Sequence, residues 1–212
     1  MHPPRNDKGR VLNNKSETEE RLSVIIPVYN EAKNLPLLYA SLQEVLGHLS
    51  MPWEVIFIDD GSNDGSLQIL GDLAATDSEH ISAVILRRNF GQTAAITAGI
   101  DHALGNIIVL MDADMQNDPA DLPLMLEKIS QVYDVVSGWR KNRQDTYITR
   151  ILPSVIANAM ISFITGVQLH DYGCTLKAYR REAITGFRLY GEMHRFIPAF
   201  ASSVGAKITE IE

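Results

Sequence analysis

One stretch of the sequence, residues 107–116, constrains the fold more than any other. Five apolar residues at 107–111 run without interruption into Asp112 and Asp114, and Gln116 follows two positions later. An unbroken apolar run is typical of a strand that is buried on both faces, as in a parallel sheet. If the chain stays extended, Asp112, Asp114 and Gln116 point to the same side. Their oxygens suit a hard cation such as Mg²⁺ or Mn²⁺, and the alternative interpretation is a solvated turn.

Similar apolar runs alternate with segments of helical apolar spacing up to Trp139. The expected strands are 22–28, 53–58, 81–86, 107–111 and 133–139, and the expected helices are 34–49, 66–75, 93–104 and 118–132. This alternation predicts the α/β class, with a parallel sheet covered by helices on both faces. Beyond Trp139 the alternation is lost, and the expected elements are a helix at 149–166, a strand at 171–179, a helix at 194–204 and a strand at 206–211.

Polar residues follow the first four expected strands directly. These clusters are Tyr29-Asn30-Glu31, Asp59-Asp60, Arg87-Arg88-Asn89 and Asp112-Ala113-Asp114. The carboxyl ends of parallel strands meet at one edge of an open sheet, and ligands bind at that edge. The position of all four clusters therefore strengthens the prediction of a metal site.

The charge of the chain is uneven. The formal net charge is -7, which argues against a general nucleic-acid binder, because such proteins need a basic surface. Residues 137–195 hold nine Lys or Arg against four acidic residues, a net charge of +5, so the remainder carries -12. A local basic zone points to an anionic ligand or a membrane surface, and a solvated face is an equally good explanation.

The remaining features of the chain are quickly described. Cys174 is the only cysteine, which excludes an internal disulfide and favours a reducing compartment. Residues 1–21 are polar and mixed in charge, and we expect a disordered tail there. The most apolar stretch, 151–169, is interrupted by Pro153 and by several polar residues, so it is not predicted to span a membrane.

Several nucleotide-binding and catalytic motifs are missing from the sequence. No glycine-rich dinucleotide fingerprint, P-loop, Gly-x-Ser-x-Gly elbow or zinc-ligand spacing occurs. A ligand that carries a diphosphate and is held through a cation fits the remaining features best. A metal that bridges two phosphates can neutralise a leaving nucleoside diphosphate.

The ordered motifs resemble those of family 2 glycosyltransferases. The motifs that carry this resemblance are Val28-Tyr29-Asn30-Glu31, Asp59-Asp60-Gly61-Ser62-Asn63-Asp64-Gly65, Arg88-Asn89-Phe90-Gly91 and Asp112-Ala113-Asp114-Met115-Gln116. Three more are similar to the polyprenyl-phosphate branch: Gly138-Trp139-Arg140, Asp171-Tyr172-Gly173-Cys174 and Glu192-Met193-His194-Arg195-Phe196. That branch includes dolichol-phosphate mannosyltransferases and bacterial undecaprenyl-phosphate glycosyltransferases.

The resemblance implies a GT-A fold, which is a Rossmann-like and mostly parallel sheet, in a single domain over 22–212. It also implies an inverting enzyme with a nucleotide-sugar donor (a UDP- or GDP-sugar), a polyprenyl phosphate acceptor and Mg²⁺ or Mn²⁺ as cofactor. We expect such an enzyme at the cytoplasmic face of a membrane, either as a monomer or as a homo-oligomer.

The resemblance also implies roles for single residues. The nucleoside-binding positions are Pro27, Tyr29, Glu31, Ile58 and Asp60. The metal and diphosphate positions are Asp112, Ala113, Asp114 and Gln116, with Arg140 at a donor phosphate. Arg150 and Asp171 match acceptor-side positions, so that Asp171, Arg150 and Asp114 form the expected catalytic set.

Alternatives remain open at this stage. Asp60 and Asp171 could be turn residues, and Arg140 could be a surface arginine. The chain could instead act on a polysaccharide or soluble acceptor, or it could be a non-catalytic nucleotide-binding relative. The basic, glycine-containing segment and the membrane helices that follow this region in related proteins are absent from the sequence, so we expect a truncated form with peripheral membrane attachment.

Overall fold

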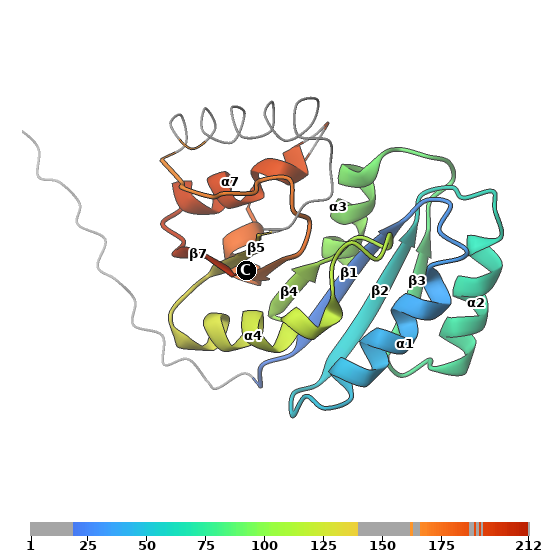
Figure 1. The fold of residues 1–212 in the computed structure, drawn as a ribbon. Coiled ribbons are helices and arrows are strands. Elements are labelled where there is room, and N and C mark those ends of the chain that lie inside the picture. Colours follow the sequence, from blue (N-terminus) through green and yellow to red (C-terminus); the bar gives the residue numbers. More distant parts are fainter. Residues whose placement is uncertain are drawn as a thin grey trace, which may run out of the picture.

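The computed structural model describes residues 19–139, 162, 166–186, 189, 191 and 193–211. Within these residues the chain forms a mixed sheet in the order β3-β2-β1-β4-β6-β5-β7 (Figure 1). Its strands are β1 (Leu22–Val28), β2 (Trp53–Asp59), β3 (Ile81–Ile85), β4 (Ile107–Leu110), β5 (Val135–Gly138), β6 (Lys177–Arg180) and β7 (Ile208–Ile211). Strand β6 is antiparallel to both of its neighbours, β4 and β5, and every other pair is parallel.

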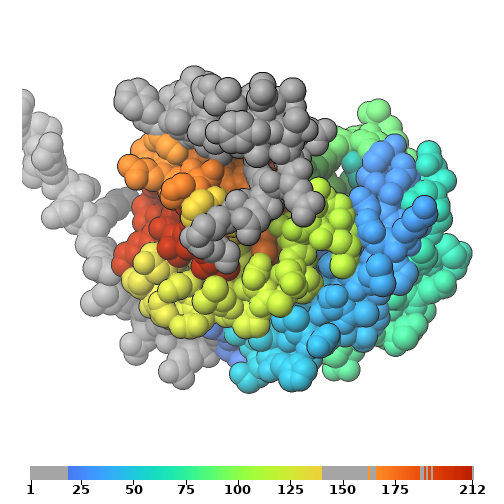
Figure 2. All heavy atoms as spheres, viewed as in Figure 1, coloured from blue at the N-terminus to red at the C-terminus, as the bar shows by residue number. Residues whose placement is uncertain are grey.

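Helices cover both faces of the sheet, as the alternation predicts. One face packs against α1 (Leu35–Leu46), α2 (Ser66–Thr76) and α4 (Leu122–Gln131), and the other against α3 (Gln92–His102), α6 (Arg181–Ile184) and α7 (Ile197–Ser203). Short 3₁₀ turns, η1 (Pro119–Asp121) and η3 (Met193–Phe196), precede α4 and α7. The central strands alternate their apolar side chains between the two cores, so their apolar surface is removed from water on both faces. Figure 2 shows the atoms of α1 (blue) and α4 (yellow-green) at the surface of the face that they cover.

The strand register sets the carboxyl edge where the polar clusters lie. Val28 pairs with Asp59, and Asp59 pairs with Ile85, so β1, β2 and β3 end together. Strand β4 ends before it reaches this edge, because its last residue, Leu110, pairs with Ile25, and β1 continues to Val28. The residues after β4 therefore run alongside the last part of β1, which brings the acidic segment level with the other clusters.

The structure differs from the sequence prediction in three elements. The strand expected at 171–179 begins only at Lys177, because the preceding residues form a turn. The helix expected at 118–132 begins as the 3₁₀ turn η1, where the Asp118 carboxylate accepts a hydrogen bond from the Ala120 N–H at 2.9 Å. The helix expected at 194–204 is divided between η3 and α7, and Pro198 lies in the first turn of α7.

Two sequence predictions fall outside the described residues. They are the polar tail, apart from its last residues, and most of the helix expected at 149–166. In the part of the chain that the structure describes, no helix has both the length and the apolar character needed to cross a bilayer.

Helix α3 packs unusually close to the sheet at Gly99. A Cβ atom at this position would lie 2.3 Å from Ile25 Cγ2 and 2.8 Å from Ile58 Cδ1. We expect Gly99→Val to lower the free energy of unfolding by about 1–3 kcal/mol, because the helix must move away from a packed core. Urea denaturation measures the effect.

Gly71, in α2, supplies the matched control. A Cβ atom there meets nothing within 4 Å. Gly71→Ala should therefore stabilise the protein by up to about 1 kcal/mol through helix propensity alone. Equal stability of the Gly99→Val variant and the wild type would contradict the close packing of α3.

Candidate active site

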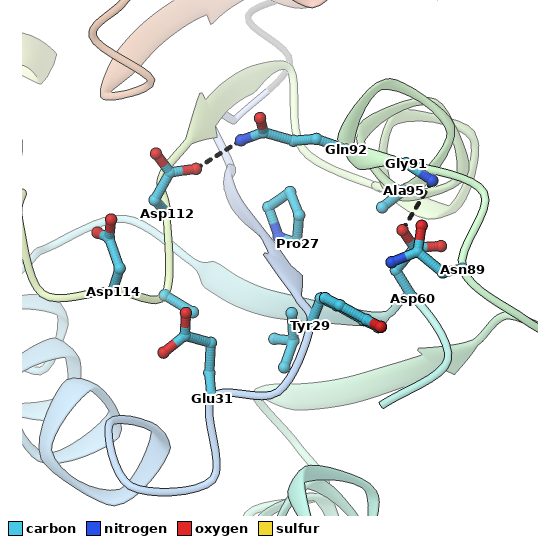
Figure 3. A pocket seen from close by; sticks show the side chains of 12 residues that line it. Pro27, Tyr29, Glu31, Asp60, Asn89, Gly91, Gln92, Ala95, Asp112 and Asp114 are labelled. Atoms are coloured by element: carbon cyan, nitrogen blue, oxygen red, sulfur yellow. Dashed lines mark hydrogen bonds between the residues drawn. The ribbon is translucent and has the colours of Figure 1, made fainter. Parts of the chain in front are cut away.

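A cavity of about 360 Å³ opens at the carboxyl edge of β1, β2 and β4. Its lining residues come from the end of β1, from the four polar clusters, and from the N-cap and first turns of α3: Pro27, Val28, Tyr29, Glu31, Asp60, Asn89, Gly91, Gln92, Ala95, Asp112, Ala113 and Asp114. Figure 3 shows Asp112, Asp114 and Glu31 on one side of the pocket and Asp60 and Asn89 on the other, with Pro27 and Tyr29 between them. The structure thus joins four of the five expected nucleoside positions with the two expected metal carboxylates.

The loop after β1 is tied to the loop after β2 by reciprocal hydrogen bonds. Asn30 has a left-handed backbone (φ 59°), and its N–H donates to Ser62 Oγ at 2.9 Å. In return, Asn63 N–H donates to Asn30 Oδ1 at 2.8 Å. The N–H of Glu31 donates to Ser66 Oγ, also at 2.9 Å. These bonds fix the backbone that carries Tyr29 and Glu31 at the rim of the pocket.

Asp64 strengthens the same connection between the loops. One carboxylate oxygen accepts from Ser66 Oγ at 2.6 Å, and the other accepts from the Ala32 N–H at 3.0 Å. These two hydrogen bonds, that from Ser66 first, lower the pKa of Asp64 below its usual value. The carboxylate is ionised at neutral pH in any case, and the lowered pKa keeps both acceptors for the loops down to a more acidic pH.

Asp60 is buried, with 3% of its surface exposed, and it holds the loop after β3. Its Oδ1 and Oδ2 accept from the N–H groups of Phe90 and Gly91, both at 2.8 Å. Next to it, Gly61 has φ 76°, and a Cβ atom there would lie 2.6 Å from the carbonyl carbon of Arg88. Asp60 thus connects the loop after β2 to the loop after β3, and it also lines the pocket. It is not merely a residue of a local turn.

Asp112 and Asp114 reach the pocket from the segment that follows β4, but they are held differently. Asp112 Oδ1 accepts from Gln92 Nε2 of α3 at 2.6 Å. Asp114 Oδ1 accepts from the N–H of Gln116 at 3.1 Å, and Met115 between them has φ 62°. The chain therefore turns after Asp114 instead of staying extended. The expected third metal ligand, Gln116, does not line the pocket.

The pocket carboxylates fit a divalent cation that is shared with a ligand. Among the described residues, no group of three His, Cys, Asp or Glu side chains is placed to hold a metal by itself. Mg²⁺ is commonly bound through only one or two carboxylates, with substrate phosphates and water as its other ligands. Asp112 and Asp114 supply this kind of donor set.

Two of the expected nucleoside positions differ in how they lie relative to the pocket. Tyr29 is 47% exposed beside Pro27, so its ring is available to a flat ligand. Ile58 is fully buried in the core on the α3 side of the sheet and does not line the pocket. The role expected for Ile58 thus receives no support from its side chain, which packs beneath the site.

Five lining residues were not predicted individually: Val28, Asn89, Gly91, Gln92 and Ala95. Asn89 and Gly91 belong to the motif Arg88-Asn89-Phe90-Gly91, which contributed to the family resemblance but was given no role for its single residues. Gln92 and Ala95 lie in the first turns of α3, and their residue types give no signal of their own. Only the packing of α3 against β1 and β2 brings them to the site.

Asp171 lies in a turn before β6 and is 2% exposed. Its Oδ1 accepts from the Gly173 N–H at 3.1 Å, so a turn role is present, as the alternative interpretation held. Asp171 does not line the pocket around Asp112. The two predicted phosphate-binding residues, Arg140 and Arg150, lie outside the described residues.

The buried Lys177 supports this turn from below. Its Nζ donates to the carbonyl oxygens of Tyr172, at 3.2 Å, and of Cys174. Lys177 also pairs with Leu110, the last residue of β4. The turn that contains Asp171 is therefore anchored next to the strand that leads into Asp112.

Comparison with known proteins identifies the family. The model of glycosyl transferase family 2 matches residues 23–187, more than half of the chain. The chain belongs to glycosyl transferase family 2. This confirms the family to which the motifs point.

Curated members of the same family are similar over most of this chain. An undecaprenyl-phosphate 4-deoxy-4-formamido-L-arabinose transferase of Pectobacterium atrosepticum is 43% identical over 193 residues, which cover 91% of this chain and 59% of the relative. A dodecaprenyl-phosphate galacturonate synthase of Rhizobium johnstonii is 45% identical over 184 residues, which cover 86% of this chain and 54% of the relative. The glycosyl transferase family 2 chain thus spans little more than half the length of these relatives.

Solved structures establish the GT-A fold. A mannosyltransferase of Pyrobaculum calidifontis, in complex with GDP-Man and Mn²⁺, aligns with a TM-score of 0.63 at 21% identity and covers 92% of this chain and 55% of its own. The glucosyl-3-phosphoglycerate synthase of Mycobacterium tuberculosis, in complex with Mn²⁺, UDP and phosphoglyceric acid, aligns with a TM-score of 0.68 at 18% identity and covers 91% and 68% of the two chains. The predicted fold class is confirmed.

Proposed function

We propose that this family 2 domain binds a nucleotide sugar and, in the complete protein, transfers its sugar with inversion to a polyprenyl phosphate. The observation that carries the proposal is the pocket at the carboxyl edge, which combines the exposed Tyr29 ring with the paired carboxylates Asp112 and Asp114. Similarity above 40% to two polyprenyl-phosphate sugar transferases supports the acceptor class.

On the donor side, the nucleoside would lie against Pro27 and Tyr29, with Asp60 and Glu31 at its edges. The diphosphate would then reach Asp112, Ala113 and Asp114. Mg²⁺ or Mn²⁺ bound there would neutralise the charge that develops on the leaving diphosphate. Arg140 would add a guanidinium, whose planar fork suits a phosphate.

On the acceptor side, a phosphate oxygen of the lipid would attack the anomeric carbon from the face opposite the diphosphate. The bond between that carbon and the diphosphate oxygen would break, and the nucleoside diphosphate would leave. Arg150 would hold the lipid phosphate. Because this phosphate is already ionised near neutral pH, Asp171 would mainly orient the acceptor or accept a residual proton.

The acceptor's isoprenoid tail requires a membrane surface, and we place the protein at the cytoplasmic face. The basic segment 137–195, with its net charge of +5, supports peripheral attachment to anionic lipids. Screening by salt should weaken such attachment, since it depends on charges at the surface.

Substitutions on the two sides of the site should separate donor binding from transfer. We expect Arg150→Ala and Asp171→Asn to reduce transfer by about 10²-fold or more while nucleotide affinity stays unchanged. The assay uses membranes from cells that express the protein, with a panel of UDP- and GDP-sugars and a short polyprenyl phosphate. Nucleotide affinity is measured by calorimetry on the purified chain.

Each contrary result has a defined meaning. A loss of nucleotide affinity in Arg150→Ala would contradict the division between donor and acceptor sides. Transfer to a water-soluble acceptor but not to the lipid would show that the proposed polyprenyl phosphate acceptor is wrong. Nucleotide binding without transfer to any acceptor would identify a non-catalytic relative.

A further inference from the structure

The first turn of α3 is fixed by one hydrogen bond on each side of Gln92. Gly91, the N-cap residue, donates its N–H to Asp60, as described above. Thr93 Oγ1 lies 2.7 Å from His194 Nδ1 in a buried hydrogen bond. Gln92 lies between these two anchors. The backbone of Gln92 is therefore held in place on both sides, and its side chain extends into the pocket.

The side chain of Gln92 forms a hydrogen bond with that of Asp112, which is 20 positions later in the chain. The distance from Gln92 Nε2 to Asp112 Oδ1 is 2.6 Å, and Figure 3 shows the two side chains meeting at the upper edge of the pocket. An ionised carboxylate only accepts hydrogen bonds, so the amide nitrogen of Gln92 must face it. A hydrogen bond to a charged acceptor is shorter and stronger than one between neutral groups.

The two carboxylates of the pocket differ in how they depend on the rest of the protein. Asp114 is held by its own turn through the N–H of Gln116. Asp112 lies beyond the end of β4, where the described ladder with β1 stops at Leu110, and Gln92 holds it from another element. The position of α3 therefore contributes to where the Asp112 carboxylate lies relative to that of Asp114.

We propose that Gln92 is a positioning residue for Asp112, which sets this carboxylate for a divalent cation and the diphosphate bound with it. This inference rests on the proposed function. Residues that hold a metal ligand in place usually change metal affinity by 10–100-fold when they are removed. Gln92→Met removes the donor and keeps nearly the same side-chain length, so the pocket wall is preserved.

The test is calorimetry of UDP and GDP binding to the purified chain, with saturating Mn²⁺ and with chelator. For Gln92→Met we expect about a 10–100-fold loss of affinity in Mn²⁺ and less than about a twofold change in chelator. Electron paramagnetic resonance of Mn²⁺, titrated with UDP present, should show the same weakening of cation binding.

Gln68 provides a matched control on α2. Its Nε2 donates to Asp72 Oδ1 at 3.0 Å on an exposed helix face, away from the pocket. Gln68→Met should change neither affinity.

Three outcomes would overturn the assignment. An equal loss with and without Mn²⁺ would make Gln92 a direct nucleotide contact or a structural residue. Unchanged affinities in Gln92→Met would show that Asp112 needs no support. If the nucleotide affinity of the wild-type protein were the same with and without Mn²⁺, the metal site itself would be wrong. This measurement comes first, so a failure of the proposed function is recognised before the variant is measured.

Discussion

Asp60→Ala is expected to weaken nucleotide binding and to destabilise the fold at the same time. The substitution removes the acceptor for two backbone N–H groups, those of Phe90 and Gly91. Leaving a buried donor without an acceptor costs about 1–3 kcal/mol, and both groups are partly buried, so we expect a total loss of about 2–4 kcal/mol. The loop after β3 forms one wall of the pocket, so its release should also lower nucleotide affinity.

Urea denaturation and calorimetry with UDP and GDP measure the two effects of Asp60→Ala. Asp72→Ala is the matched control, because Asp72 is an exposed carboxylate on α2 that accepts only from a neighbouring side chain in the described structure. It should change stability by less than about 0.5 kcal/mol. A stable Asp60→Ala protein would mean that the loop holds its position without this carboxylate.

Asp114→Asn should remove most of the contribution of the metal to nucleotide binding. Asparagine keeps the shape of aspartate, and its Oδ1 can still accept from the Gln116 N–H, so the turn should persist. The charge is lost, and a hard cation binds an amide oxygen much more weakly than a carboxylate. We expect affinity in Mn²⁺ to fall by about 10²-fold, towards the value measured in chelator.

Asp118→Asn tests whether this effect is specific. Asp118 follows in the same acidic segment, caps η1 through the Ala120 N–H and does not line the pocket. Asp118→Asn should leave the dependence of nucleotide affinity on Mn²⁺ unchanged. If both substitutions reduced affinity equally, general electrostatics would explain the result and the assignment of Asp114 as a ligand would be wrong.

The sequence predicted the first half of the fold well, because each of its elements has a clear apolar period and ends at a polar cluster. Strand β6 was placed too early, because the Asp171 turn depends on hydrogen bonds from Gly173 and Lys177 that no local pattern shows. Its insertion between β4 and β5 is a long-range pairing, which periodicity does not encode.

Within the site, acidic residues were easier to predict than the side chains that position them. Asp60, Asp112 and Asp114 stand directly after strands, and the structure brings all three to the pocket. Gln116 was expected to join them because extended geometry was assumed, but the left-handed Met115 turns the chain. Gln92 could not be recognised, since a glutamine at the start of a helix gains a role only through its partner.

The antiparallel strand β6 restricts how chimeras between this chain and its relatives can be built. The strand comes late in the sequence, yet it lies between β4 and β5, which both precede it. A chimera that joined the first 139 residues of one relative to the remainder of another would place a foreign strand in the middle of the sheet. A chimera of this chain therefore keeps a native sheet only if β6 comes from the same protein as β4 and β5.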